Sequence, residues 1–273
     1  MVKTSTGLNM NRQHGQNEGA LLGAGDPDPL WIANAAGRSP LLLTCDHAGL
    51  QIPAALGDLG VSAADMQRHI ACDIGVEAVG RLLAQQLDAV CIGQRYSRLV
   101  IDCNRQPGSE GSIAEISDGS VIHGNLGLTP AGADLRRREI FDPYHARIAQ
   151  ELDARAARGE SCALILLHSF TPAWDGVARP WHIGLLYNRD ARLARSLLQA
   201  LQEHDHAAEF LVGDNQPYSG TDGTDYALNH YGEARGLPYI ELEIRQDLIS
   251  GRDGQQLWAE RLARALPAAF SAL

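Results

Sequence analysis

The sequence predicts an α/β protein of three layers, in which helices cover both faces of a central, mostly parallel but mixed sheet. Five apolar residues, 163–167, run without a break into His168. Such a run is typical of a strand that is buried on both faces, as strands of parallel sheets are. The length of 273 residues and the hydrophobic content of 45% are enough for one large core. We therefore expect a single α/β domain over residues 29–273, preceded by a polar arm at residues 1–28.

Three other apolar segments have the same form as the His168 segment. Residues 41–49 end in Asp46 and His47, residues 99–105 in Asn104 and Arg105, and residues 239–245 in Glu243 and Arg245. In open α/β sheets, ligands bind just beyond the carboxyl ends of the strands. Four strands that each deliver polar side chains at one end therefore predict a single site.

A helix is expected between the first two of these strands. Ser62 and Asp65 match the pattern of a capping box, and an apolar stripe continues the helix to about residue 87. Asp73 then lies at the edge of the buried face of this helix. A carboxylate there needs a partner, which can be an arginine, a backbone amide or a metal ion.

The other elements follow from apolar runs and from helix start signals. Further strands are expected at 30–34, 89–93, 181–187 and 209–212, and helices at 129–158 (broken at Asp142-Pro143), 190–204, 224–236 and 253–270. The long loop 107–125 and the segment 214–226 are expected to shape the pocket.

Charge and composition exclude several classes of partner. The net charge of -10 argues against binding to nucleic acid or to an anionic membrane. No apolar run approaches the roughly 20 residues of a membrane span, and the polar N-terminus has no signal-peptide core, so a cytoplasmic protein is expected. The five cysteines are scattered without C-x-x-C spacing, which predicts neither a disulfide framework nor a zinc finger.

Five motifs occur in an order that resembles the N-formylglutamate amidohydrolase family. They are LLLTCDHAG, HIACDIG, YSRLVIDCNRQP, LHSFTP and YIELEIRQDL, and they span residues 41–248. The family is similar in fold to the zinc carboxypeptidases, which are phosphorylase/hydrolase-like α/β proteins. The resemblance implies a hydrolase of linear amide bonds that converts N-formyl-L-glutamate to formate and L-glutamate.

The resemblance also implies one zinc ion per chain, with His47 and His168 as ligands. A catalytic zinc ion usually has three protein ligands and one open position for water. In the carboxypeptidases the third ligand is a glutamate three residues after the first histidine, but Leu50 stands at that position here. Asp73, in the HIACDIG motif, is the expected substitute, and Asp46 is the alternative.

The strand at 239–245 carries two carboxyl groups and an arginine on one face. Glu241, Glu243 and Arg245 alternate with apolar residues, so they point the same way. Glu243 lies nearer the end of the strand and matches the Glu-apolar-Arg segment of the wider group, which makes it the expected general base. Glu241 is expected to pair with an arginine inside the protein.

Arginines are the expected contacts of an anionic substrate. Arg105 is expected to hold a substrate carboxylate through a bidentate fork, with an added contact from Asn104. Arg98 and Arg179 would engage a second carboxylate or the oxyanion, or else form ordinary salt bridges. Two alternatives remain open: a deacylase or small peptidase with another substrate, and a non-catalytic binding protein of the same fold.

Overall fold

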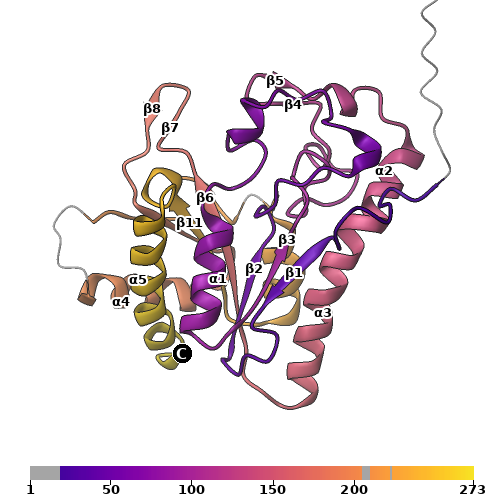
Figure 1. Ribbon diagram of the computed structural model, residues 1–273. Helices are drawn as coiled ribbons and strands as arrows, with labels where there is room; N and C mark the ends of the chain where they lie inside the picture. Colours follow the sequence, from indigo (N-terminus) through magenta and orange to yellow (C-terminus); the bar gives the residue numbers. More distant parts are fainter. Residues whose placement is uncertain (1–18, 205–209, 222) are drawn as a thin grey trace, which may run out of the picture.

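A central sheet of seven strands organises the molecule (Figure 1). The computed structural model describes residues 19–204, 210–221 and 223–273. The strands are β1 (Leu30–Ala33), β2 (Leu41–Cys45), β3 (Val90–Gln94), β6 (Ala163–Phe170), β9 (Ile183–Leu186), β10 (Val212–Asp214) and β11 (Tyr239–Arg245). Their order is β1-β3-β2-β6-β11-β9-β10. The four inner strands from β3 to β11 are parallel, whereas β1 and β9 run antiparallel to β3 and β11. The prediction of a mostly parallel, mixed sheet is confirmed.

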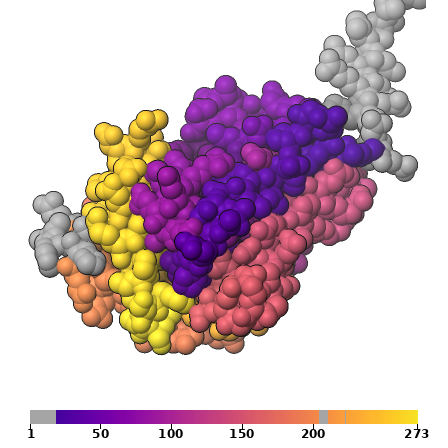
Figure 2. All heavy atoms as spheres, turned by 60° about the horizontal axis from the view of Figure 1, so that its bottom comes forward, coloured from indigo at the N-terminus to yellow at the C-terminus, as the bar shows by residue number. Residues whose placement is uncertain are grey.

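Helices cover both faces of this sheet and complete three layers. One face packs against α1 (Val76–Gln86), α4 (Arg192–His204) and α5 (Arg252–Ser271), and the other against α2 (Pro130–Arg136) and α3 (Asp142–Ala157). In Figure 2, α5 in yellow and α3 in pink lie on opposite sides of the N-terminal strands. Successive residues of β6 enter opposite cores, since Ile165 packs with the first set of helices and Leu166 with the second.

The short elements lie mainly in the connections. Two hairpins, β4 (Ile116–Ser117) with β5 (Ser120–Val121) and β7 (Ala173–Trp174) with β8 (Val177–Ala178), stand above one end of the sheet in Figure 1. The single helical turns are η1 (Ala54–Leu56), η2 (Asp65–Gln67), η3 (His123–Asn125) and η6 (Gln246–Leu248). Two π-helical segments are η4 (Arg137–Phe141) and η5 (Leu228–Glu233). Segment η4 joins α2 to α3, and α3 begins at Asp142 with Pro143 in its first turn. The boundary predicted at Asp142-Pro143 is therefore present, as a change from π-helix to α-helix.

The helix predicted from residue 62 to residue 87 is wrong in its first half. The capping box forms, since the Asp65 amide donates to the Ser62 hydroxyl at 3.0 Å, but it opens only the single turn η2. Helix α1 begins later, after Gly75, which has a left-handed φ of 83°. A Cβ at this position would lie 2.2 Å from the carbonyl oxygen of Ile249, so only glycine fits here. Asp73 therefore lies in a loop before α1.

The strand predicted at residues 99–103 is also absent. These residues are buried, but they form turns; for example, the amide of Val100 donates to the carbonyl of Ser97 at 2.9 Å. These residues are apolar because they are buried: a loop covered by α2 and α3 is shielded from solvent as completely as a strand in the sheet. Asn104 and Arg105 follow this loop rather than a strand.

The predicted N-terminal arm lies partly outside the described residues. Its last ten residues, 19–28, contact the rest of the molecule: Leu21 is buried, and the carbonyl of Pro27 accepts a hydrogen bond of 2.7 Å from the hydroxyl of Tyr96. Among the described residues, no helix is long and apolar enough to cross a membrane.

His145 on α3 should make the fold sensitive to acid. Its Nε2 lies 2.8 Å from the carbonyl oxygen of Cys103, and burial lowers its pKa from 6.5 to about 3. The folded state keeps this imidazole neutral, whereas the unfolded chain protonates it below pH 6.5. Stability that is present above pH 6.5 is therefore lost progressively as the pH falls toward 3.

We expect His145→Gln to reduce the loss of unfolding free energy between pH 7 and pH 4.5. Urea unfolding at both pH values measures this loss. The matched control is His123→Gln, because His123 is exposed. An equal loss in wild type and in His145→Gln would show that other groups cause the acid sensitivity.

Candidate active site

Three adjacent parallel strands deliver the predicted site residues to one pocket. Strand β2 ends just before His47, β6 carries His168, and β11 carries Glu243 directly opposite His168. All three side chains line the same pocket, although more than 70 residues separate each from the next in the chain. The predicted convergence of two imidazoles and a carboxyl group is therefore what the fold produces.

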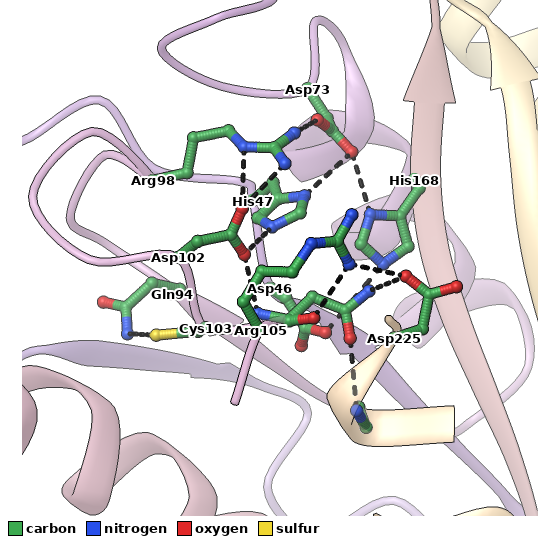
Figure 3. A network of polar contacts seen from close by, with 12 residues as sticks. Asp46, His47, Asp73, Gln94, Arg98, Asp102, Cys103, Arg105, His168 and Asp225 are labelled. Carbon is green, nitrogen blue, oxygen red and sulfur yellow. Dashed lines mark hydrogen bonds and ion pairs between the residues drawn. The ribbon is translucent and has the colours of Figure 1, made fainter. Parts of the chain in front are cut away.

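Asp73 joins the two histidines in a buried cluster (Figure 3). Its Oδ2 atom lies 3.0 Å from Nδ1 of His168 and 3.6 Å from Nδ1 of His47. The backbone fixes this loop, because the Asp73 amide donates to the carbonyl of His47 at 2.9 Å. One ligand atom from each of the three residues lies within 4.8 Å of the others.

The cluster has the chemistry of a metal site. Two imidazole nitrogens and one carboxylate oxygen are a common donor set of catalytic zinc, and three protein ligands leave a position for water or substrate. The alternative ligand, Asp46, lies on the far side of His168: its Oδ2 is 3.9 Å from Nε2, and its Oδ1 accepts a hydrogen bond from Tyr144. The geometry therefore favours Asp73 over Asp46 as the third ligand.

Asp102 and Arg98 form hydrogen bonds and ion pairs with residues of the cluster. Asp102 Oδ1 lies 2.6 Å from Nε2 of His47, so this carboxylate orients the ring with Nδ1 toward Asp73. Arg98 donates to Asp102 Oδ2 from Nε at 3.2 Å and from its terminal nitrogen at 2.7 Å, and its other terminal nitrogen lies 3.4 Å from Asp73 Oδ1. Although burial raises the pKa of Asp102, Arg98 and His47 hold it well below its ordinary value. Of the two roles considered for Arg98, the structure shows the salt bridge.

Asp102→Asn is expected to weaken metal binding by about 10- to 100-fold, as is usual when a carboxylate behind a ligand is removed. The amide can place its nitrogen against Nε2 of His47 and upset the tautomer that leaves Nδ1 free. Competition for zinc with a chelator of known affinity measures the change. Asp88→Asn, at an exposed ion pair with Arg38, is the control. Unchanged zinc affinity in Asp102→Asn would mean that His47 does not bind metal through Nδ1.

Arg105, Asn104 and Asp225 form a second group on the pocket wall. A terminal nitrogen of Arg105 donates to Asp225 Oδ1 at 2.9 Å, and the side-chain amide of Asn104 donates to the same oxygen at 3.1 Å. Asp225 therefore holds both predicted substrate contacts in place. Within the described residues, Nε and the second terminal nitrogen of Arg105 make no hydrogen bond.

The two carboxyl groups of β11 both face the pocket. Burial is the main cause that raises the pKa of Glu243 to about 8; His168 opposes this shift and nearby Asp73 adds to it. Glu241 is 2% exposed, and burial followed by repulsion from Asp225 raises its pKa well above the ordinary value. The predicted ion pair of Glu241 with an arginine is wrong: among the described residues no arginine bonds it, and its Oε2 has no hydrogen-bond partner.

Both predicted segments contribute to the rim of the pocket. Loop 107–125 supplies Ser117 and Asp118, and segment 214–226 supplies Tyr218, Thr224 and Asp225. Arg179 stands behind this rim, where its guanidinium lies 4.8 Å from the ring of Tyr218 and bonds the Tyr218 hydroxyl at 3.0 Å. The pocket volume of about 230 Å³ suits a small molecule.

Sequence reasoning missed Asp102 and Asp225. Asp102 stands two residues before Asn104 in the YSRLVIDCNRQP motif, but the position of an acid within an apolar run does not indicate which histidine it will contact. Asp225 follows a polar loop, where carboxylates are common and mostly solvated. Both become visible only when segments far apart in the chain pack together.

Together, the fold and this pocket define an α/β enzyme of the hydrolase class. The model of the family "N-formylglutamate amidohydrolase" matches residues 39–250, and the chain belongs to this family. It is a hydrolase that acts on amide C–N bonds, as the motifs predicted.

Several relatives share most of the chain. N-formylglutamate deformylase of Pseudomonas putida is 27% identical over 249 residues, which are 84% of this chain and 88% of the relative. A gene product of Agrobacterium tumefaciens is similar in structure, with a TM-score of 0.85 and 34% identity over 92% of this chain and 98% of that one. N-formylglutamate amidohydrolase from Ralstonia eutropha JMP134 shares the fold, with a TM-score of 0.68 and 19% identity over 90% of this chain and 98% of that one.

Proposed function

We propose that the protein is a zinc-dependent amidohydrolase that hydrolyses N-acylated amino acids. The observation that carries the proposal is the His47–Asp73–His168 cluster beside Glu243, a carboxyl group in the same pocket whose Oε2 has no hydrogen-bond partner among the described residues. N-formyl-L-glutamate is the first substrate to test, because the family and the Pseudomonas putida relative carry its name.

His47, Asp73 and His168 would hold the metal ion. When bound, such an ion lowers the pKa of water toward neutral and polarises a scissile carbonyl. Glu243 accepts a proton from the attacking water and delivers it to the leaving amine, so that the C–N bond breaks to give a carboxylic acid and a free amino acid. Glu243 stands opposite His168 in the pairing of β11 with β6 and lines the same pocket as the cluster.

Arg105 would bind the α-carboxylate of the substrate. The two nitrogens of Arg105 that make no hydrogen bond to the described residues form one side of the guanidinium, which is the geometry that carboxylates accept in a bidentate pair. Asp225 and the carbonyl of Asn104 fix the opposite terminal nitrogen, so the fork is already oriented. Arg179 is a further arginine near the rim, where it bonds the hydroxyl of Tyr218.

The reaction is tested with zinc-loaded protein and a panel of N-formyl and N-acetyl amino acids, with release of free amino acid as the readout. We expect hydrolysis of at least one N-formyl amino acid, about one zinc ion per chain, and loss of turnover after chelation with recovery on adding zinc. Full turnover in metal-free protein would reject the zinc requirement. A protein that binds amino acids but cleaves no amide would instead be the non-catalytic binding protein of this fold.

A further inference from the structure

Arg179 is a half-buried arginine beside the pocket that forms no ion pair with any of the described residues. The two arginines of the pocket lining differ from it, because Arg98 and Arg105 are each paired with a buried aspartate. Charged side chains that lose part of their hydration are normally paired. The charge of Arg179 is therefore available to an anion that comes from outside the chain.

Aromatic rings and two hydroxyl groups hold Arg179 in place. Its guanidinium carbon lies 4.8 Å from the ring centroid of Tyr218, 5.4 Å from that of Trp174 and 6.0 Å from that of Phe170. One terminal nitrogen donates to the hydroxyls of Tyr218 and Thr171, both at 3.0 Å. All four of these neighbours line the pocket. The guanidinium group is thus fixed immediately behind one part of the pocket wall.

Tyr218 connects this charge to the interior of the pocket. Its hydroxyl oxygen accepts a hydrogen bond from Arg179, and no described residue accepts the proton of the hydroxyl itself. Burial, followed by the nearby charge of Glu243, raises the pKa of Tyr218, so the hydroxyl keeps this proton at neutral pH. A hydroxyl group that accepts from a cation is also a stronger donor, because hydrogen bonds in a chain polarise one another.

The location of Tyr218 relates it to the substrate. Tyr218 is 41% exposed at the rim, whereas Glu243 is 6% exposed at the base of the pocket. A substrate with its amide at Glu243 and its α-carboxylate at Arg105 has its side chain left to place, and the rim is the part of the pocket that remains. A carboxylate at the end of that side chain would meet the Tyr218 hydroxyl, with the charge of Arg179 behind it.

We propose that Tyr218, oriented by Arg179, recognises the side-chain carboxylate of the substrate. The inference rests on the proposed amide hydrolysis and assigns the second carboxylate of N-formyl-L-glutamate to this pair. Tyr218 donates to the carboxylate directly. Arg179 is a positioning residue that acts through Tyr218, because it holds the hydroxyl and adds positive charge.

The test compares N-formyl-L-glutamate with N-formyl-L-glutamine, in which an amide replaces only the side-chain carboxylate. Zinc-loaded wild type should favour the glutamate compound by about tenfold or more in kcat/KM. Tyr218→Phe keeps the ring beside Arg179 and removes the donor, so it should lower this preference by about tenfold, mainly through KM for the glutamate compound.

Variants of Arg179 test the contribution of its charge. Arg179→Gln should lower the preference for the glutamate compound by about tenfold or more, and Arg179→Lys, which keeps the charge, should retain more of it. Arg158→Gln, at an exposed ion pair with Glu160, is the matched control and should keep the wild-type preference. An equal fall of kcat/KM for both compounds in Tyr218→Phe and in Arg179→Gln would overturn the inference, because the pair would then act on the amide that both substrates share.

Binding of the amino-acid products separates this inference from the proposed reaction. Calorimetry compares L-glutamate with L-glutamine on zinc-loaded wild type, Tyr218→Phe and Arg179→Gln. Tighter binding of L-glutamate that is lost in both variants supports the subsite even if no amide is cleaved, in which case the reaction alone is wrong. Cleavage of both formyl compounds by wild type at equal kcat/KM would overturn the subsite and leave the hydrolase in place. If Arg179→Gln does not fold, Tyr218→Phe and wild type still decide.

Discussion

Glu243→Gln should lower kcat by about 10³-fold while the protein keeps its zinc. The amide has nearly the same shape, but it cannot accept a proton from water or pass one to the leaving amine. Glu243 is outside the His47–Asp73–His168 cluster, so metal content should remain at one ion per chain. Steady-state kinetics and metal analysis on the same preparation measure both quantities.

Glu260→Gln is the matched control for this prediction, since it makes the same change on α5 at an exposed position. Its kcat should equal that of wild type. If Glu243→Gln turns over at nearly the wild-type rate, another group is the base. If it loses zinc together with activity, Glu243 is a metal ligand rather than a base.

Asp73→Asn should remove the metal and with it the activity. The carboxylate faces Nδ1 of both histidines, whereas an amide oxygen is a much weaker ligand for zinc. Loss of a residue that only hydrogen-bonds to a metal ligand lowers metal affinity by at most roughly 100-fold, and we expect the loss of Asp73 itself to lower zinc affinity by more than this. Zinc retained after dialysis against a chelator, compared with wild type, measures the effect.

Asp46→Asn is the informative comparison, because Asp46 is the other candidate ligand. Its oxygens face Tyr144 and Nε2 of His168, so this variant should keep zinc better than Asp73→Asn does. The reverse order of zinc retention would assign the third ligand to Asp46. Thermal unfolding of both zinc-free variants shows whether either change acts through the fold instead.

The mainly apolar segments at 41–45 and 163–167, and the alternation of apolar and polar residues at 239–245, were sufficient to predict three of the inner strands and the edge at which their polar residues meet. Strands buried on both faces are mainly apolar, so polar residues near the end of such a run indicate that the strand approaches the edge of the sheet where ligands bind. His47, His168 and Glu243 could be found in this way because each lies within two residues of the end of its strand.

Partners across the pocket depend on packing between loops, and no local pattern encodes them. The sequence predicts Asp73 on a helix, but α1 begins only after Gly75. Asp73 therefore lies in a loop, and this loop brings its carboxylate to the histidines. The charges of Asp102 and Glu241 also depend on packing. Arg98 and His47 form ion pairs with Asp102, whereas no cation among the described residues bonds to Glu241. Which buried charge is balanced is a property of three-dimensional neighbours, because electrostatic energy depends on distance through space and not along the chain.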